Sequence, residues 1–191
     1  MALKKSKSEK KTAKEKIMFV ALDLFAKKGY HRTSTVNISK KANISSGLLF
    51  YHFGSKEGLL KSIVEMLLSR LDDIFDLENY SDPNKMLEII IDRFFDSLQK
   101  NRSYWDLYMA LLYQPDTKKH ILEQVISHSK KFRHEIYKLM HKMGNRDPGA
   151  NSFEFEILRV GVFASYLSNH NDKVLEKARQ TMKSKYLHQP F

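Results

Sequence analysis

The sequence contains no cysteine, and glycine and proline are scarce, with 7 and 4 among 191 residues. Without cysteine the chain can form neither a disulfide nor a thiolate metal site. It also lacks a run of about 20 apolar residues, the length that a membrane span requires. The basic start leads into a polar stretch, unlike a signal peptide, whose charged start leads into an apolar core. These absences predict a cytoplasmic protein with long, uninterrupted helices.

Positive charge is concentrated in the first third of the chain. Residues 1–61 carry fourteen Lys and Arg against four Asp and Glu, whereas residues 62–191 carry nineteen against eighteen. A polyanion suits the first segment, because each phosphate that Lys or Arg neutralises releases condensed counterions. Within it, residues 1–11 are predicted to form a flexible basic arm, with a merely solubilising tail as the alternative.

Apolar residues recur at helical spacing along nearly the whole chain, which predicts an all-α protein of about nine helices. The first helix carries Ile17, Ala21, Leu24 and Phe25 on one face and ends at Lys27-Lys28-Gly29. The other predicted helices cover residues 36–41 (with Thr35 as N-cap), 46–52, about 56–75 (capped by Ser55), 83–98 (starting at Asp82-Pro83), 103–113, 117–143, 153–167 and 172–187. Residues 144–149 are predicted to form a loop. Because residues 153–167 are apolar on nearly all sides, we expect that helix to be buried on more than one face.

Residues 33–53 have the pattern of a helix-turn-helix, two short helices joined by a tight turn. Asn43 lies in the turn, and asparagine tolerates the left-handed conformation that such a turn requires. Five residues are expected to pack these helices together and onto the first one: Val36, Ile38, Ala42, Ile44 and Leu49. In a helix-turn-helix the second helix enters the major groove of DNA with its N-terminus first. The alternative is a pair of short bundle helices in which Tyr51 and His52 pack in the core.

The outward-facing residues of this segment suit a contact with DNA. Hydroxyls at a helix N-terminus can meet phosphates or base edges, a glycine there permits close approach of the backbone, and Tyr, His and Lys can donate to phosphates. The predicted DNA-binding residues are Thr35, Ser45, Ser46, Gly47, Leu48, Tyr51, His52 and Lys56.

The same stretch resembles the N-terminal signature of the TetR family of regulators. That signature has a Thr-rich entry, Ile-Ala-x-x-Ala-Gly-Val-Ser-x-Gly, aromatic residues, Phe, and then Ser-Lys-Glu-x-Leu. Here residues 38–47 read Ile-Ser-Lys-Lys-Ala-Asn-Ile-Ser-Ser-Gly, residues 50–53 Phe-Tyr-His-Phe and residues 55–59 Ser-Lys-Glu-Gly-Leu. Ser39 and Asn43 replace the usual Ala and Gly. Leu48 stands where a hydroxyl or small residue is common, which suggests an apolar contact with a thymine methyl group.

The resemblance, which covers about residues 15–65, implies a helix-turn-helix domain at residues 12–55 and a helical ligand-binding and dimerisation domain at residues 56–191. It implies a ligand-responsive transcriptional regulator, with repression as the favoured mode. Such a protein would bind a pseudo-palindromic operator in double-stranded DNA as a homodimer and would be released by a small ligand. Residues 153–167 and the last helix are the candidate dimer interface, with a plain core helix as the alternative that does not exclude it.

A ligand pocket would lie between helices of the second domain, where aromatic and Met residues are frequent. Such residues at helical spacing also form ordinary cores, which is the alternative for each of them. An apolar pocket would favour a hydrophobic or aromatic ligand. The candidate pocket residues are Phe94, Phe95, Leu98, Trp105, Tyr108, Met109, Leu112 and Phe132.

No pattern indicates catalysis, a metal or a cofactor. There is no phosphate-binding Gly-Lys-Ser/Thr loop, no nucleophile elbow and no His-Glu-x-x-His. His120, His128, His134 and His141 include no i, i+4 pair and are predicted to lie at the surface. Two other functions stay open: a non-specific DNA-binding protein, and a helical small-molecule-binding protein whose basic arm docks on an acidic membrane. The arm lacks an apolar face, which argues against the membrane function.

Overall fold

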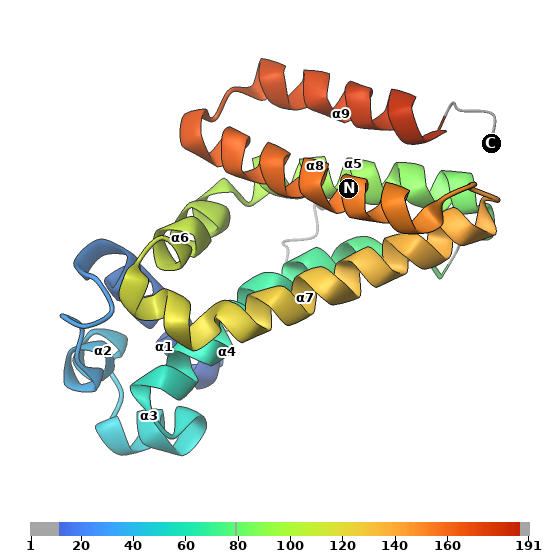
Figure 1. Cartoon of the computed structure of the whole chain (residues 1–191). Coiled ribbons are helices and arrows are strands. Elements are labelled where there is room, and N and C mark those ends of the chain that lie inside the picture. Colours follow the sequence, from blue (N-terminus) through green and yellow to red (C-terminus); the bar gives the residue numbers. More distant parts are fainter. Residues whose placement is uncertain (1–11, 79, 188–191) are drawn as a thin grey trace, which may run out of the picture. The chain divides into compact units, whose positions relative to one another are not determined.

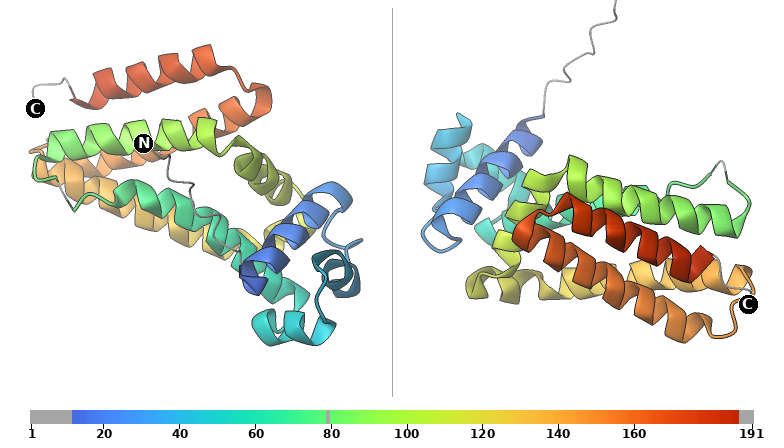
Figure 2. Two further views of the ribbon diagram at one scale, coloured as in Figure 1. Left: turned by 180° about the vertical axis from the view of Figure 1, so that it is seen from behind. Right: turned by 90° about the horizontal axis from the view of Figure 1, so that it is seen from above.

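The computed structural model describes residues 12–78 and 80–187 (Figures 1 and 2). Within these ranges it contains nine α-helices, one short 3-10 helix and no strand, which confirms the predicted all-α class. The helices are α1 (Ala13–Lys28), α2 (Thr35–Ala42), α3 (Ser46–Phe53), α4 (Lys56–Asp72), α5 (Pro83–Lys100), α6 (Arg102–Leu112), α7 (Pro115–Lys142), α8 (Pro148–Asn169) and α9 (Asp172–Leu187), with the 3-10 helix at Asp73–Phe75. The predicted basic arm, residues 1–11, lies outside the described residues.

Helix caps explain most of these boundaries. The N–H of Gly29 donates to the carbonyl of Phe25 and ends α1 as predicted. Ser55 accepts a hydrogen bond from the N–H of Gly58 at 2.9 Å at the start of α4. Asp82 accepts one from the N–H of Asn84, also at 2.9 Å, and the proline that follows it occupies the first turn of α5.

Two predicted boundaries are wrong. The N-cap of α2 is Ser34, whose Oγ accepts from the N–H of Asn37 at 3.1 Å, and Thr35 is the first helical residue. The sequence predicts a loop at Pro148, but α8 begins there. Asp147 is the N-cap of this helix, and its side chain accepts a hydrogen bond from the N–H of Ala150. Proline is compatible with the first turn of a helix because the N–H it lacks has no intrahelical partner there.

The chain divides into two compact units, one ending at Ile63 and the other beginning at Val64. The predicted domain boundary after residue 55 stays a prediction. In the first unit, α1 packs against α2 and α3 around fully buried side chains. These include Ile17, Ala21, Phe25, Ile38 and Leu49. Val36, predicted to pack there as well, is 62% exposed, because it lies on the opposite face of α2 from Ile38 and Ala42.

In the second unit, α5, α7, α8 and α9 lie side by side (Figures 1 and 2). The stripe predicted on α5 is buried throughout: Leu87, Ile90, Ile91, Phe94, Phe95 and Leu98. Helix α9 is attached to α5 partly by ion pairs, since Lys183 Nζ lies 2.7 Å from Asp92 and Arg179 Nη2 lies 3.0 Å from Asp96. Among the described residues, no helix combines the length and apolar character that a transmembrane segment would need.

Helix α8 corrects the expectation that it is buried on more than one face. Phe153, Ile157 and Val160 are exposed in the single chain, and Ile157 reaches 56%. The buried face instead contains a charged pair, Glu156 and Arg159. An exposed apolar row beside a buried ion pair is the reverse of the usual arrangement on a surface helix.

Candidate functional site

The turn between α2 and α3 has the geometry of a helix-turn-helix. Asn43 adopts the left-handed conformation, with φ 53° and ψ 55°, and its N–H donates to the carbonyl of Lys40 at 3.2 Å. Two residues later, Ser45 caps α3 by accepting from the N–H of Leu48 at 3.1 Å. This geometry confirms the turn predicted at Asn43, and it explains how asparagine stands in for the usual glycine.

Helix α3 presents polar and aromatic side chains on its open face. Ser45, Ser46 and Gly47 are exposed at its N-terminus, and Tyr51 is 83% exposed farther along. The burial of Leu49 and Phe53 holds this face outward, because residues four apart share one side of a helix. Tyr51 is therefore not part of a core, which removes the alternative in which it packs there with His52. Their assignment to DNA contacts stays a prediction.

Three other predicted DNA-binding residues are less exposed. Thr35, Leu48 and His52 are half-buried, so each still presents part of its side chain to the surface. The ring of His52 lies between its neighbours, with its centroid 5.3 Å from that of Tyr51 and 6.0 Å from that of Phe53.

Lys56 makes contacts within the first unit that its position in the sequence did not reveal. Its Nζ donates to the carbonyls of Tyr30 and Thr33, at 3.0 and 3.2 Å, and lies 4.3 Å from the centre of the Tyr30 ring. Partial burial lowers the pKa of this lysine. These contacts attach the start of α4 to the segment that follows α1, so Lys56 positions the helix-turn-helix whether or not it also meets a phosphate.

Two exposed apolar residues were missed or misassigned. The sequence predicts that Val36 is buried and assigns no role to Phe50, yet the side chains of both residues are exposed in the first unit. Helical spacing identifies Phe50 in retrospect, because Leu49 and Phe53 are both inward and the residue after Leu49 therefore turns away. Ser39, where the family signature has Ala, is buried, and its hydroxyl finds no hydrogen-bond partner among the described residues.

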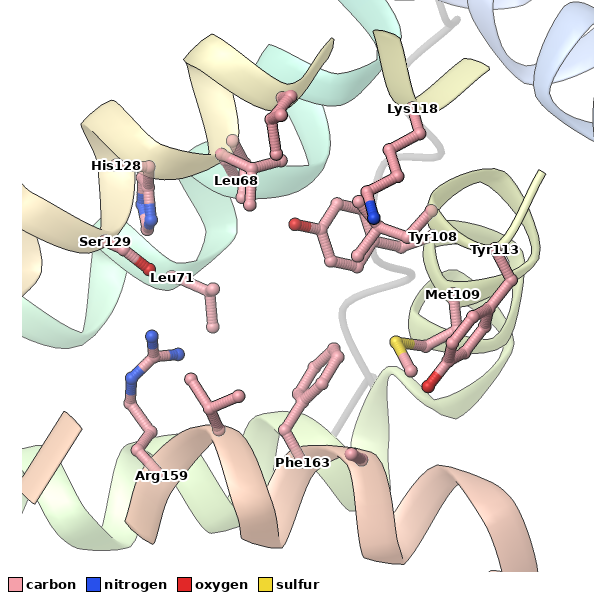
Figure 3. A pocket seen from close by; sticks show the side chains of 15 residues that line it. Leu68, Leu71, Tyr108, Met109, Tyr113, Lys118, His128, Ser129, Arg159 and Phe163 are labelled. Atoms are coloured by element: carbon pink, nitrogen blue, oxygen red, sulfur yellow. The ribbon is translucent and has the colours of Figure 1, made fainter. Parts of the chain in front are cut away.

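The second unit contains a pocket of about 330 Å³ bounded by α4, α6, α7 and α8 (Figure 3). Most of its wall is apolar, and it includes Leu68, Leu71, Leu122, Val125 and Phe163. Of the predicted pocket residues, the structure brings Tyr108, Met109 and Leu112 to this wall. The other five are core side chains that do not line it: Phe94, Phe95, Leu98, Trp105 and Phe132.

Polar groups enter this pocket from three helices. Arg159 of α8 and His128 and Ser129 of α7 line it, together with the phenol of Tyr108, whose burial raises its pKa to about 12. His128 therefore contradicts the prediction that the α7 histidines lie at the surface. His120 is also half-buried, whereas His134 and His141 are exposed as expected. No group of histidines and carboxylates in the described part of the chain could hold a metal ion.

A second hollow of about 420 Å³ follows the outer side of α8 and α9. It is lined by Ile157, Gly161, Val174 and Ala178, among others. It is continuous with the exposed apolar row of α8, since Ile157 belongs to both. The sequence predicts this pair of helices as a candidate dimer interface, but it does not show which face of the pair is exposed.

Comparison with known proteins shows which regulators this chain resembles. Residues 17–63 match the family model described as "Bacterial regulatory proteins, tetR family". The biofilm operon negative transcriptional regulator IcaR of Staphylococcus epidermidis is 31% identical over 119 residues, which cover 59% of this chain and 62% of IcaR. The transcriptional regulator BetI of Stenotrophomonas maltophilia is 30% identical over 95 residues, 46% of this chain and 48% of BetI. The chain thus spans between about half and three fifths of the curated relatives it matches.

Solved structures resemble the chain over nearly its whole length. A transcriptional regulator of the TerR/AcrR family from Aquifex aeolicus is 25% identical with a TM-score of 0.64, covering 92% of this chain and 100% of the other. NalD of Pseudomonas aeruginosa, the secondary repressor of the MexAB-OprM multidrug efflux pump, has a TM-score of 0.74 at 18% identity, covering 93% and 98%. At such an identity the likeness to NalD establishes the fold alone.

Proposed function

We propose that the chain is a member of the TetR family of bacterial regulatory proteins, whose family model matches residues 17–63, and that it is a ligand-responsive transcriptional repressor rather than an enzyme. It binds a pseudo-palindromic operator as a homodimer and is released by a small, largely apolar molecule. The observation that carries this proposal is the open face of α3, whose N-terminus is capped by Ser45 and on which Ser46, Gly47 and Tyr51 are exposed. The relative IcaR, which is named a negative transcriptional regulator, supports repression.

The DNA-binding part of the proposal is tested by selecting binding sites from a random duplex pool and measuring mobility shifts with the selected sequence. Specific protein–DNA complexes typically bind about 10³-fold or more tighter than non-specific ones. We expect a site with two related half-sites whose centres lie about one helical turn, or slightly more, apart. Equal affinity for every duplex, with steep dependence on salt, would instead identify a non-specific DNA-binding protein.

A homodimer is supported by the apolar row on α8 and the hollow beside α9. An isologous pairing of these two helices with their copies would bury the row in a four-helix interface. It would also supply the two recognition helices that a palindrome requires.

We therefore expect Ile157→Glu to convert the dimer to a monomer, because it places an unpaired charge at the centre of that interface. Light scattering after size-exclusion chromatography measures the mass, and mobility shift measures the operator affinity, which should fall with it. Ile126→Glu is the matched control, since Ile126 is a comparably exposed isoleucine on α7 outside the row. If the Ile157 variant stays dimeric, the interface lies elsewhere.

A ligand response is supported by helix α4. This helix begins at Lys56, shortly after α3 ends at Phe53, and its later residues Leu68 and Leu71 line the pocket. A ligand that moves α4 would thus move the segment that follows the recognition helix. The shift in operator affinity can be no larger than the ligand's differential affinity for the two conformers.

A further inference from the structure

One end of the α4–α6–α7–α8 pocket differs from the rest of its wall. Figure 3 shows the guanidinium of Arg159 extending from α8 across the cavity toward Ser129 and His128 on α7. The remaining wall is dominated by leucine, valine and aromatic side chains. A ligand in this space would meet hydrogen-bond donors at one end and apolar side chains along its length.

Arg159 is buried but keeps donors for a ligand. Its side chain is 6% exposed and pairs with Glu156 through Nε and Nη2, at 3.1 and 2.9 Å, while the guanidinium carbon lies 4.2 Å from the centre of the Phe132 ring. The third nitrogen, Nη1, takes no part in the pair with Glu156. Glu156 is not among the residues that line the pocket, so the face presented to the cavity is that of a cation. A guanidinium can only donate, so its partner there must be an acceptor.

His128 adds a group that can change its charge. Its Nε2 is buried and lies 3.3 Å from Oδ1 of Asp72, the last residue of α4. Burial, the largest influence, lowers the pKa of His128, as do the cations Arg159 and Lys131, whereas Asp72 raises it. Since its pKa lies below the ordinary value, the imidazole of His128 is mostly neutral at pH 7 and can still take up a proton.

We propose that this pocket binds an amphipathic carboxylate: Arg159 and Ser129 receive the carboxylate head, His128 lies beside it, and the apolar body extends along Leu68, Leu71 and Phe163. The proposal rests on the ligand-binding part of the proposed function and names the chemical class of that ligand.

The charges at this end of the pocket favour an anion over a cation or a neutral molecule. A cationic head would be repelled by Arg159, and an alcohol oxygen is a neutral acceptor, so its bond to the guanidinium is weaker than that of a carboxylate, in which both partners are charged. Glu156 neutralises Arg159 in the empty pocket, so an added carboxylate brings one net negative charge. His128 can offset that charge by taking up a proton, since a nearby anion raises the pKa of a histidine.

The test uses three probes with apolar chains of nearly equal length: decanoate, decanol and decyltrimethylammonium. Trp105, the one tryptophan of the sequence, reports binding by fluorescence because its ring centre lies 5.5 Å from that of Phe163 in the pocket wall. We expect decanoate to bind at least about 10-fold more tightly than decanol, the ratio that one charge-assisted hydrogen bond provides. Decyltrimethylammonium should bind more weakly than decanol. Decanol or decyltrimethylammonium binding as tightly as decanoate would overturn the proposal.

Variants locate the head group. Arg159→Met alone would strand the carboxylate of Glu156, so it is combined with Glu156→Gln, and circular dichroism checks the fold. The double variant should bind decanoate and decanol with similar affinity, and Ser129→Ala should lose part of the preference. Lys118→Met is the control, because Lys118 is the other cation in the wall but is exposed. If the preference for decanoate disappears in the Lys118 variant and survives in the double variant, the proposed head site is wrong.

Proton uptake provides an independent measurement. Decanoate should bind more tightly as the pH falls from about 8 to about 6, because only the bound state protonates His128 in that range. The same titration on His128→Gln should be flat. If no probe binds while the operator is still recognised, the carboxylate proposal is wrong and the proposed DNA-binding function is unaffected. If the probes bind as expected but no operator is recognised, the DNA-binding function is wrong and the carboxylate proposal is unaffected.

Discussion

Replacing Gly47 with alanine is expected to weaken operator binding roughly tenfold or more while leaving the protein as stable as before, or up to about 1 kcal/mol more stable. A Cβ built on Gly47 would meet only the Oγ of Ser45, at an ordinary 3.9 Å. The free protein therefore has no steric need for glycine here, and alanine favours a helix. The expected loss of affinity follows from the proposed close approach of the α3 N-terminus to DNA, which a methyl group would obstruct.

Gly58→Ala is the matched control for this experiment. A Cβ on Gly58 would collide with the backbone carbonyl of Phe53, so that glycine is required by the fold itself. Its replacement should lower the midpoint of thermal unfolding and reduce DNA binding only in proportion to the folded fraction. Thermal unfolding and mobility shift on both variants separate the two roles. Unchanged operator affinity in the Gly47 variant would show that DNA does not approach this residue closely.

Replacing Glu156 with alanine should destabilise the second unit by about 3–5 kcal/mol, the usual cost of leaving a buried charge without its partner. Glu156 and Arg159 are 6% and 5% exposed, and their two hydrogen bonds lie on the inner face of α8. Urea unfolding followed by circular dichroism measures the change in the free energy of unfolding.

Two further variants separate the ion pair from a simple loss of volume. The double variant Glu156→Leu with Arg159→Met should recover most of the stability, because apolar side chains of similar size can replace a buried pair. Glu135→Ala breaks a pair of the same spacing on α7, Lys138 with Glu135 at 2.6 Å, which is far more exposed. It should change the free energy of unfolding by at most about 1 kcal/mol. Equal effects at Glu135 and Glu156 would contradict the importance of burial.

Local patterns in the sequence were sufficient for the helices and the DNA-binding motif. The stripe on α5, the cap at Asp82 and the left-handed Asn43 each depend on residues a few positions apart, and each is found where it was predicted. The charge of the first third and the order of the signature motifs likewise depend only on the order of residues along the chain. They were sufficient to reveal the resemblance to the TetR family before any contact was known.

The pocket and the exposed face of α8 were decided only by the tertiary structure. Periodicity shows which residues share one side of a helix, but not which neighbouring helix covers that side. Five of the predicted pocket residues therefore turned out to be core, while His128 and Arg159, whose distance in the sequence hides their proximity, line the cavity. The sequence by itself determined the helices, most of their caps and the helix-turn-helix pattern, because these depend on neighbours along the chain. Which faces remain open, and which charges are buried, depended on how helices far apart in the sequence pack together.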